Sequence, residues 1–171
     1  MKAGYRAAME WLYIACIVLA GLAMLVITII IPYGVFMRYV MNSASGWPEP
    51  AGILMMILFS FIGGAAAYRA NAHIAVGTLL NAVNTVNRKR LERTGDVGMG
   101  IIGLFMIKWG ILLVQTVWQN TIAEFPDLSV GVTYLPIPVA GLITLLFCIE
   151  RLWLGEPPPN SFTFRDQPQT E

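Results

Sequence analysis

The strongest candidate for a chemically active residue in this sequence is an ionisable side chain deep within a hydrophobic run. Lys108 interrupts the apolar stretch from Val97 to Trp118. A charge at the centre of a membrane span costs at least about 2.5–3.5 kcal/mol on insertion scales, so such a residue is a functional candidate by default. Gln115 and Gln119 follow one turn apart. An ion-coupling role for Lys108 competes with snorkelling towards an interface and with contact to another subunit.

The other reactive residue types do not form a catalytic pattern. His73 is the only histidine, whereas a zinc or haem site needs several ligands at fixed spacing. Cys16 and Cys148 lie in apolar runs, where the expected role is that of a small buried hydrophobe. The sequence holds no Ser-His-Asp, paired-carboxylate or phosphate-loop arrangement. We therefore expect no enzyme activity, no cofactor, no metal site and no nucleic-acid partner.

The composition places these residues in a membrane protein. Charged residues make up 12% of the 171-residue chain, against about 25% in a soluble domain. Four runs reach the roughly 20 apolar residues that a transmembrane helix needs. We predict an all-α integral membrane protein, with one domain at residues 1–154 and a Pro-rich, disordered tail at 155–171. The predicted spans cover residues 11–37, 51–69, 96–119 and 130–153.

The polar interval between the second and third spans predicts an amphipathic helix at residues 75–91. Apolar residues recur there mostly every three or four positions, with asparagines and basic residues between them. The segment is too polar to cross the membrane, so we expect it to lie along the interface or to pack on a partner protein. His73 precedes it and is interpreted as a structural hydrogen-bonding residue.

The ends of the second span carry further signals. Pro48 and Pro50 suit a helix start, and Trp47 before them suits a membrane interface. Gly63 and Gly64 near the other end would let helices approach closely. The connection at residues 121–129 is expected to be a short acidic loop, and Glu150 and Arg151 are interpreted as anchors at a helix end.

Charge distribution predicts the orientation. Cytoplasmic segments of membrane proteins carry an excess of Lys and Arg. With both termini inside, nine basic residues fall on the cytoplasmic side and only Arg38 falls outside. The nine are Lys2, Arg6, Arg69, Arg88, Lys89, Arg90, Arg93, Arg151 and Arg165. The run Arg88, Lys89, Arg90 and Arg93 could also bind anionic lipid headgroups.

Several short motifs, in this order, resemble one family. Arg38 and Tyr39 follow the first span, Trp47 and Glu49 open the second, and Gly63 and Gly64 lead to Arg69 and His73. Tyr134, Leu135 and Pro136 lie in the fourth span. From Arg38 to Trp153 the chain resembles the DctQ-like small membrane subunit of tripartite ATP-independent periplasmic (TRAP) transporters. Relatives often have two adjacent acidic residues where this chain has Glu49 alone between prolines.

The resemblance implies a non-catalytic scaffold in the bacterial inner membrane. Such subunits pair with a large membrane subunit that carries the substrate and sodium sites, while a periplasmic binding protein delivers the solute, often an organic acid. Contacts with the large subunit or the membrane are expected at Arg38, Tyr39, Trp47, Glu49, Gly63, Gly64, Arg69, His73, Lys108, Tyr134 and Pro136. Docking of the binding protein is expected at Arg38, Glu49, Glu124 and Asp127.

Two other functions compete with the scaffold. A self-sufficient oligomeric channel or exporter would line its pore with Lys108, Gln115 and Gln119 and would produce flux without partners. A redox-enzyme subunit holding haem or quinone is disfavoured by the single histidine, His73.

Overall fold

The structure is a computed structural model in which every long element is a helix. It describes residues 2–43, 45–70 and 85–155, with the backbone alone for residues 2, 3, 85–90 and 92. Within this part of the chain four helical segments are long and apolar enough to cross a membrane, as predicted. The elements are α1 (Lys2–Tyr39), α2 (Pro48–Arg69), α4 (Thr85–Val117), β1 (Thr121–Ile122), β2 (Phe125–Ser129), α5 (Val130–Tyr134) and α6 (Pro136–Leu154).

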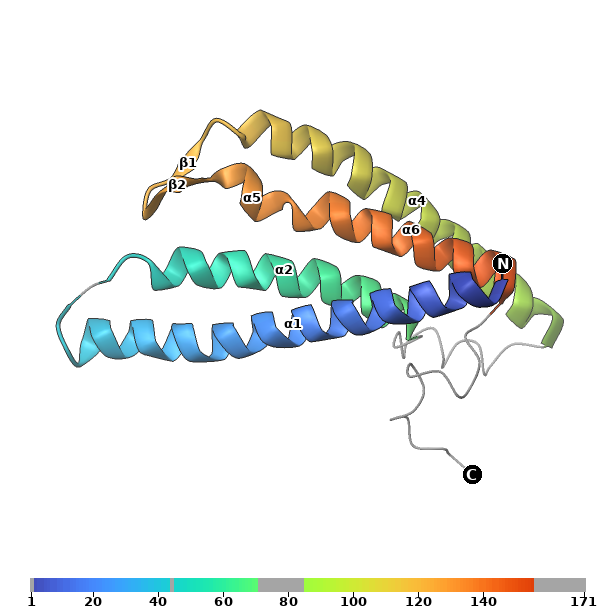
Figure 1. Cartoon of the computed structure of the whole chain (residues 1–171), viewed down its shortest axis with the longest axis horizontal. Coiled ribbons are helices and arrows are strands. Elements are labelled where there is room, and N and C mark those ends of the chain that lie inside the picture. Colours follow the sequence, from blue (N-terminus) through green and yellow to red (C-terminus); the bar gives the residue numbers. More distant parts are fainter. Residues whose placement is uncertain (1, 44, 71–84, 156–171) are drawn as a thin grey trace, which may run out of the picture.

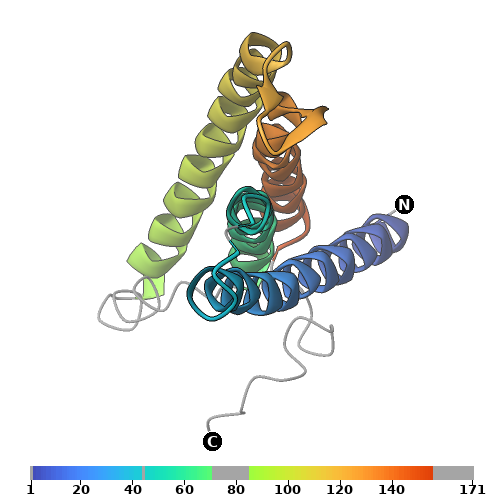
Figure 2. The same ribbon diagram turned by 90° about the vertical axis from the view of Figure 1, so that its left-hand side faces the viewer.

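The spans lie side by side in the order α1, α2, α6, α4 rather than closing into a ring. Extensive packing joins α1 to α2, α2 to α6 and α6 to α4. Figure 2 shows α1 and α4 on opposite sides of the central α2 and α6. In Figure 1 the N-terminus, the ends of α2 and α6 and the start of α4 converge at one end. The loop after α1 and the β1–β2 hairpin lie at the other, which we call the hairpin end.

The first helix is longer than the predicted span. It runs for 38 residues and continues through Pro32. At 1.5 Å per residue its length is about 57 Å, against a hydrocarbon core of about 30 Å. In a membrane α1 must therefore tilt or extend beyond the core. The chain turns at Asn42, whose φ of 50° lies in the left-handed region, and α2 begins with Pro48 at its first position, where no backbone N–H is needed.

The third span begins near Arg93, close to the prediction, but the helix that contains it begins earlier. We expected it to start near residue 96, after a separate interfacial helix at 75–91, but α4 is one continuous helix from Thr85. The last seven residues of the expected interfacial helix are thus the first turns of α4. His73 and residues 75–84 lie outside the described part of the chain, so the interfacial helix stays a prediction there.

The fourth span is two helices that join at Leu135. Pro136 has no backbone N–H, so the regular bonding of α5 cannot continue through it. The Leu135 N–H ends α5 by donating to the carbonyls of Gly131 and Val132. Before this break, the expected acidic loop forms an antiparallel hairpin with a bulge between Thr121 and Ile122. The Ser129 hydroxyl caps α5 by accepting from the Gly131 N–H at 3.0 Å.

Glycine brings α4 and α6 together. A Cβ built on Gly141 would lie 2.9 Å from the Gly103 carbonyl oxygen and 3.1 Å from the Ile107 nitrogen, both backbone atoms. The expected glycines of α2 behave differently. A Cβ on Gly63 would meet Ala20 of α1 at an ordinary 3.5 Å, and one on Gly64 would meet nothing within 4 Å. Of these three glycines, only Gly141 brings the backbones of two helices into contact, as small residues permit.

Candidate functional site

Two oppositely charged side chains from distant parts of the chain meet in the interior. Arg69 ends α2 and is 2% exposed, while Glu150, near the end of α6, is 1% exposed. Arg69 Nε donates to Glu150 Oε2 at 2.8 Å, and Arg69 Nη2 donates to Glu150 Oε1 at 2.9 Å. This two-point contact is among the stronger kinds of charge-assisted hydrogen bonding in proteins.

A second ion pair lies beside the first and brings in α4. Asp96 Oδ1 is 3.0 Å from Arg151 Nε and accepts a 2.8 Å hydrogen bond from the Tyr68 hydroxyl. The Asp96 backbone carbonyl accepts from the Cys148 thiol at 3.0 Å. The Arg151 guanidinium lies 5.3 Å from the centre of the Tyr68 ring. Three helices, α2, α4 and α6, are therefore joined through one carboxylate and its neighbours.

Arg69, Asp96, Glu150 and Arg151 form what we call the ionic cluster. Two cations face two anions, so the cluster is formally neutral. Removing each ion from water costs several kcal/mol, which pairing and hydrogen bonding offset. The Arg69 guanidinium also lies 5.2 Å from the centre of the Tyr13 ring in α1. Side chains of all four spans thus meet at the end where the helices converge (Figure 1).

The start of α1 is tied to the same end. The Tyr5 hydroxyl donates to the Leu146 carbonyl at 3.0 Å, and Arg6 Nη2 donates to the Leu154 carbonyl at 2.8 Å. The last carbonyls of a helix have no partner within the helix, so a cation there is favourable. The Tyr5 ring packs edge-on against Trp153 with 6.4 Å between ring centres. These contacts extend the ionic cluster into a joint that fixes the helices relative to one another.

Sequence reasoning missed this cluster. We interpreted Arg69 as a topology signal and a partner contact, and Glu150 and Arg151 as anchors. In the structure Arg69 and Glu150 are buried against each other. The sequence feature that could have predicted the cluster is the common depth of its residues in the membrane. Arg69 ends one span, Asp96 begins the next, and Glu150 ends the last. In a protein with alternating spans these positions fall at the same membrane boundary.

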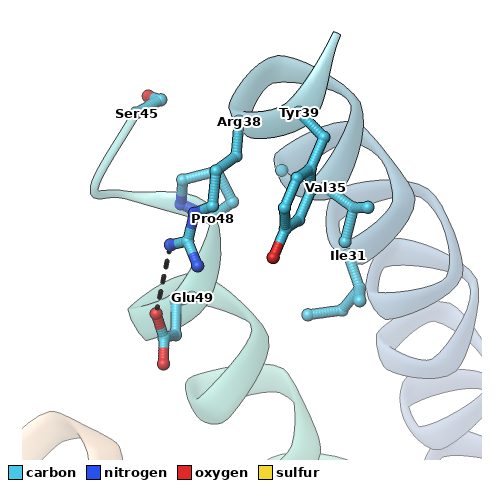
Figure 3. Close-up of a pocket in the computed structure, with 8 residues that line it drawn as sticks. Ile31, Val35, Arg38, Tyr39, Ser45, Pro48 and Glu49 are labelled. Carbon is cyan, nitrogen blue, oxygen red and sulfur yellow. Dashed lines mark ion pairs between the residues drawn. The ribbon is translucent and has the colours of Figure 1, made fainter. Parts of the chain in front are cut away.

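The hairpin end carries several of the predicted site residues. Arg38 Nη2 and Glu49 Oε2 lie 3.8 Å apart, with 56% and 75% of their side chains exposed. Figure 3 shows them lining a hollow of about 210 Å³ between α1 and α2, together with Tyr39. Trp47 packs beside the Tyr33 ring at 5.8 Å between centres. An exposed ion pair of this kind contributes about 0–1 kcal/mol, so Arg38 and Glu49 remain available to a partner.

The two hairpin acids lie at the same end as this hollow. Glu124 and Asp127 are both exposed and take part in lining an apolar groove of about 550 Å³ between the hairpin, α1 and α2. A Cβ on Gly46 would lie 3.3 Å from Glu124 Cγ, so the loop after α1 contacts the hairpin. The structure therefore gathers the four predicted docking residues, Arg38, Glu49, Glu124 and Asp127, at one end of the layer (Figure 1).

Lys108 lies exposed on the outer side of α4, in the middle of a span. Its Nζ is 5.7 Å from the centre of the Trp109 ring, and no ion pair to it occurs among the described residues. An exposed cation–π contact contributes about 0.5–1 kcal/mol, less than the 2.5–3.5 kcal/mol or more that the charge costs at mid-membrane. Gln115 shares this face two turns on and is exposed, whereas Gln119 lies beyond the end of α4.

The remaining predicted residues occupy varied positions. Tyr134 ends α5 and Pro136 begins α6, both half-buried at the break in the fourth span. Arg93 is exposed near the start of α4. Of the other basic residues in this run, Arg88, Lys89 and Arg90, the structure describes only the helical backbone, and His73 lies outside it.

Comparison with known proteins agrees with this architecture. Residues 27–156 match the family described as tripartite ATP-independent periplasmic transporters, DctQ component. A protein of Haemophilus influenzae whose assigned name is that of a TRAP transporter small permease protein is 27% identical over 141 residues, which are 82% of this chain and 84% of that one. The chain therefore belongs to the DctQ family: it is the small permease subunit of a TRAP transporter, a multi-pass membrane protein that is not an enzyme.

Proposed function

We propose that this subunit is a rigid scaffold for a moving partner in the membrane. The observation that carries the proposal is the ionic cluster, in which the buried Arg69, Asp96 and Glu150 are committed to contacts within the chain. Charges paired in this way hold helices together and do not offer a site to a solute. The exposed apolar edges of α1 and α4 are free to meet lipid or another membrane protein.

The scaffold reading assigns the transport chemistry to other chains. The family is one component of a tripartite system, so partner subunits are implied. We infer a large membrane subunit that takes up an organic acid-type solute with sodium, and a periplasmic binding protein that delivers it. If this chain is a scaffold, the sodium and solute sites belong to the large subunit.

We infer that the end with the ionic cluster faces the cytoplasm of a bacterial cell and that the hairpin end faces the periplasm. The positive-inside distribution supports this orientation, because nine basic residues fall on one side and Arg38 alone on the other. Both termini are then cytoplasmic. Single cysteines at Ala123 and Gly155, in a chain with Cys16 and Cys148 replaced by alanine, test it. An impermeant maleimide added to intact spheroplasts should label position 123 and not position 155; the reverse pattern overturns the orientation.

Reconstitution tests the scaffold function. The large subunit and the binding protein from the same genome are placed in proteoliposomes with and without this chain. We expect solute uptake driven by a sodium gradient only when all three are present, and no ion or solute flux from this chain alone. Uptake by the other two proteins without this chain contradicts the proposal.

The second candidate function is an oligomeric channel or exporter. The observation that favours it is the shared face of Lys108 and Gln115 on α4, although Gln119 lies outside that helix. Its distinguishing result is flux from the purified chain alone that disappears in Lys108→Met.

Docking of the binding protein can be tested at the hairpin. We expect Glu124→Lys with Asp127→Lys to weaken binding-protein docking and uptake together, because both carboxylates are exposed at the hairpin end. Ala123→Gln on the same hairpin is the matched control. If the double reversal leaves docking and uptake at the level of this control, the two acids have no part in docking.

A further inference from the structure

The outer face of α4 has a charge at its centre, and none of the residues that the structure describes covers it. We propose that this face docks against a membrane helix of the large subunit that carries an aspartate or glutamate at the depth of Lys108. The inference rests on the proposed function and adds to it the docking face and the chemistry of the partner residue. The α4 outer face consists of Ile101, Leu104, Phe105, Lys108, Leu112 and Gln115, all exposed.

These residues form one face because of helix geometry. Positions three, four and seven apart lie on the same side of a helix with 3.6 residues per turn. Lys108 is at the middle of this set. The flanking side chains are large and apolar, with 60% of Phe105 and 51% of Leu112 exposed. A single charge surrounded by such residues is typical of an intramembrane contact between proteins rather than of a water-exposed surface.

Lys108 is too far from either boundary for its charge to reach water easily. The span runs from Arg93 to Val117, which places Lys108 about 22 Å from one end and about 14 Å from the other at 1.5 Å per residue. The nearer end is the C-terminal one. Snorkelling there would require the side chain to point against its usual direction, because Cα–Cβ bonds tilt towards the helix N-terminus. Lipid headgroup phosphates lie at these same two boundaries and are therefore equally out of reach of Lys108. The counter-charge must therefore come from within the membrane.

A second copy of this chain cannot supply that counter-charge from the middle of a span. Two copies inserted in the same direction hold equivalent residues at equal depth. The sequence has no acidic residue in the runs 11–37, 51–68, 97–117 or 130–149, so a second copy offers only another Lys108 at that depth. Like charges facing each other are unfavourable. The occupant of the α4 outer face is consequently a different membrane protein.

The opposite edge of the layer provides the comparison. The outer side of α1 is as exposed and apolar as that of α4, with Leu22 at 57% and Leu25 at 62%. It carries no charge between Trp11 and Met37. Lipid can cover such a surface without a polar partner. Charge complementarity therefore selects α4 over α1 as the docking edge.

Photocrosslinking in the complex tests which edge docks. The full chain is co-expressed with the tagged large subunit from the same genome, with a photoreactive phenylalanine analogue at Phe105 or Leu112, or at Leu22 or Leu25 as matched controls. We expect the two α4 positions to crosslink to the large subunit and the two α1 positions not to. Crosslinks from α1 alone, or from α4 to a second copy of this chain, overturn the inference.

Charge substitutions test the role of Lys108. We expect Lys108→Glu to lower the amount of chain that co-purifies with the large subunit at least tenfold, and Lys108→Arg to retain it. Leu25→Glu, which puts an acid on the exposed edge of α1, controls for the general effect of an acid in the span. Lys108→Met should weaken the complex but leave the chain alone at least as stable as wild type, because it removes an uncompensated charge.

Rescue identifies the partner residue and separates the possible failures. Replacing one intramembrane acid of the large subunit by lysine should restore co-purification with Lys108→Glu and not with Leu25→Glu. Equal losses in Lys108→Glu and Leu25→Glu, without rescue at any acid, overturn the docking inference while the scaffold function stands. If the wild-type chain does not co-purify with the large subunit at all, the proposed function fails, and the docking inference fails with it.

Discussion

Glu150→Gln is the sharpest test of the ionic cluster. The substitution keeps the shape of the side chain and removes its charge, which leaves the Arg69 guanidinium, 2% exposed, without its paired carboxylate. Removing one partner of a buried ion pair costs about 3–5 kcal/mol. Since about 1.4 kcal/mol corresponds to a factor of ten, the equilibrium constant for folding should fall by roughly a hundred- to several-thousand-fold.

The assay is the reversible unfolding of the full chain in detergent micelles by added dodecyl sulfate, followed by tryptophan fluorescence. Glu49→Gln is the matched control, because it removes the same charge from an exposed pair with 3.8 Å between the charged atoms. We expect that control to lower the free energy of unfolding by less than about 1 kcal/mol. The difference between the two variants measures what burial adds.

A double replacement keeps the test decisive if Glu150→Gln does not fold. Arg69→Met with Glu150→Leu removes both charges and fills the space with apolar side chains, and such replacements are often neutral or stabilising. We expect its free energy of unfolding to be close to that of the wild type. Equal, small effects of Glu150→Gln and Glu49→Gln would refute the reasoning, because the ionic cluster would then not be what holds the helices at this end.

Three further predictions use the same unfolding assay. Gly141→Ala should destabilise the chain by about 1–3 kcal/mol, because its Cβ would meet backbone atoms of α4 at 2.9 and 3.1 Å. Gly64→Ala, where a Cβ meets nothing within 4 Å, should leave stability unchanged or raise it by up to about 1 kcal/mol. Ser129→Ala should cost about 1–2 kcal/mol, since its hydroxyl caps α5 and donates to the Trp118 carbonyl at 2.6 Å. Tyr68→Phe should cost about 1.5–3 kcal/mol by removing a buried hydrogen bond to a carboxylate, and Tyr39→Phe, 75% exposed, should have almost no effect.

Some of the fold could be predicted from the chain because it depends on local properties. Run length and the scarcity of charge predicted the four spans. Pro48 and Pro50 indicated a helix start, because proline has no N–H to lose at a first helical position, and α2 begins at Pro48, three residues before the predicted span. The start of α4 was predicted too late, since the polar residues of its first turns were assigned to a separate interfacial helix. Helix continuity across a polar segment depends on backbone hydrogen bonds, which composition does not reveal.

The site divides in the same way. The sequence by itself determined that Lys108 lies within a span, because its neighbours on both sides are apolar. Only the tertiary structure decided that Lys108 lies on an outer face, that Gly141 meets Gly103, and that Arg69 pairs with Glu150 across 81 positions of sequence. The physical reason is that composition fixes how deep a residue lies along a membrane helix, whereas the direction it faces depends on how the helices rotate and pack against each other.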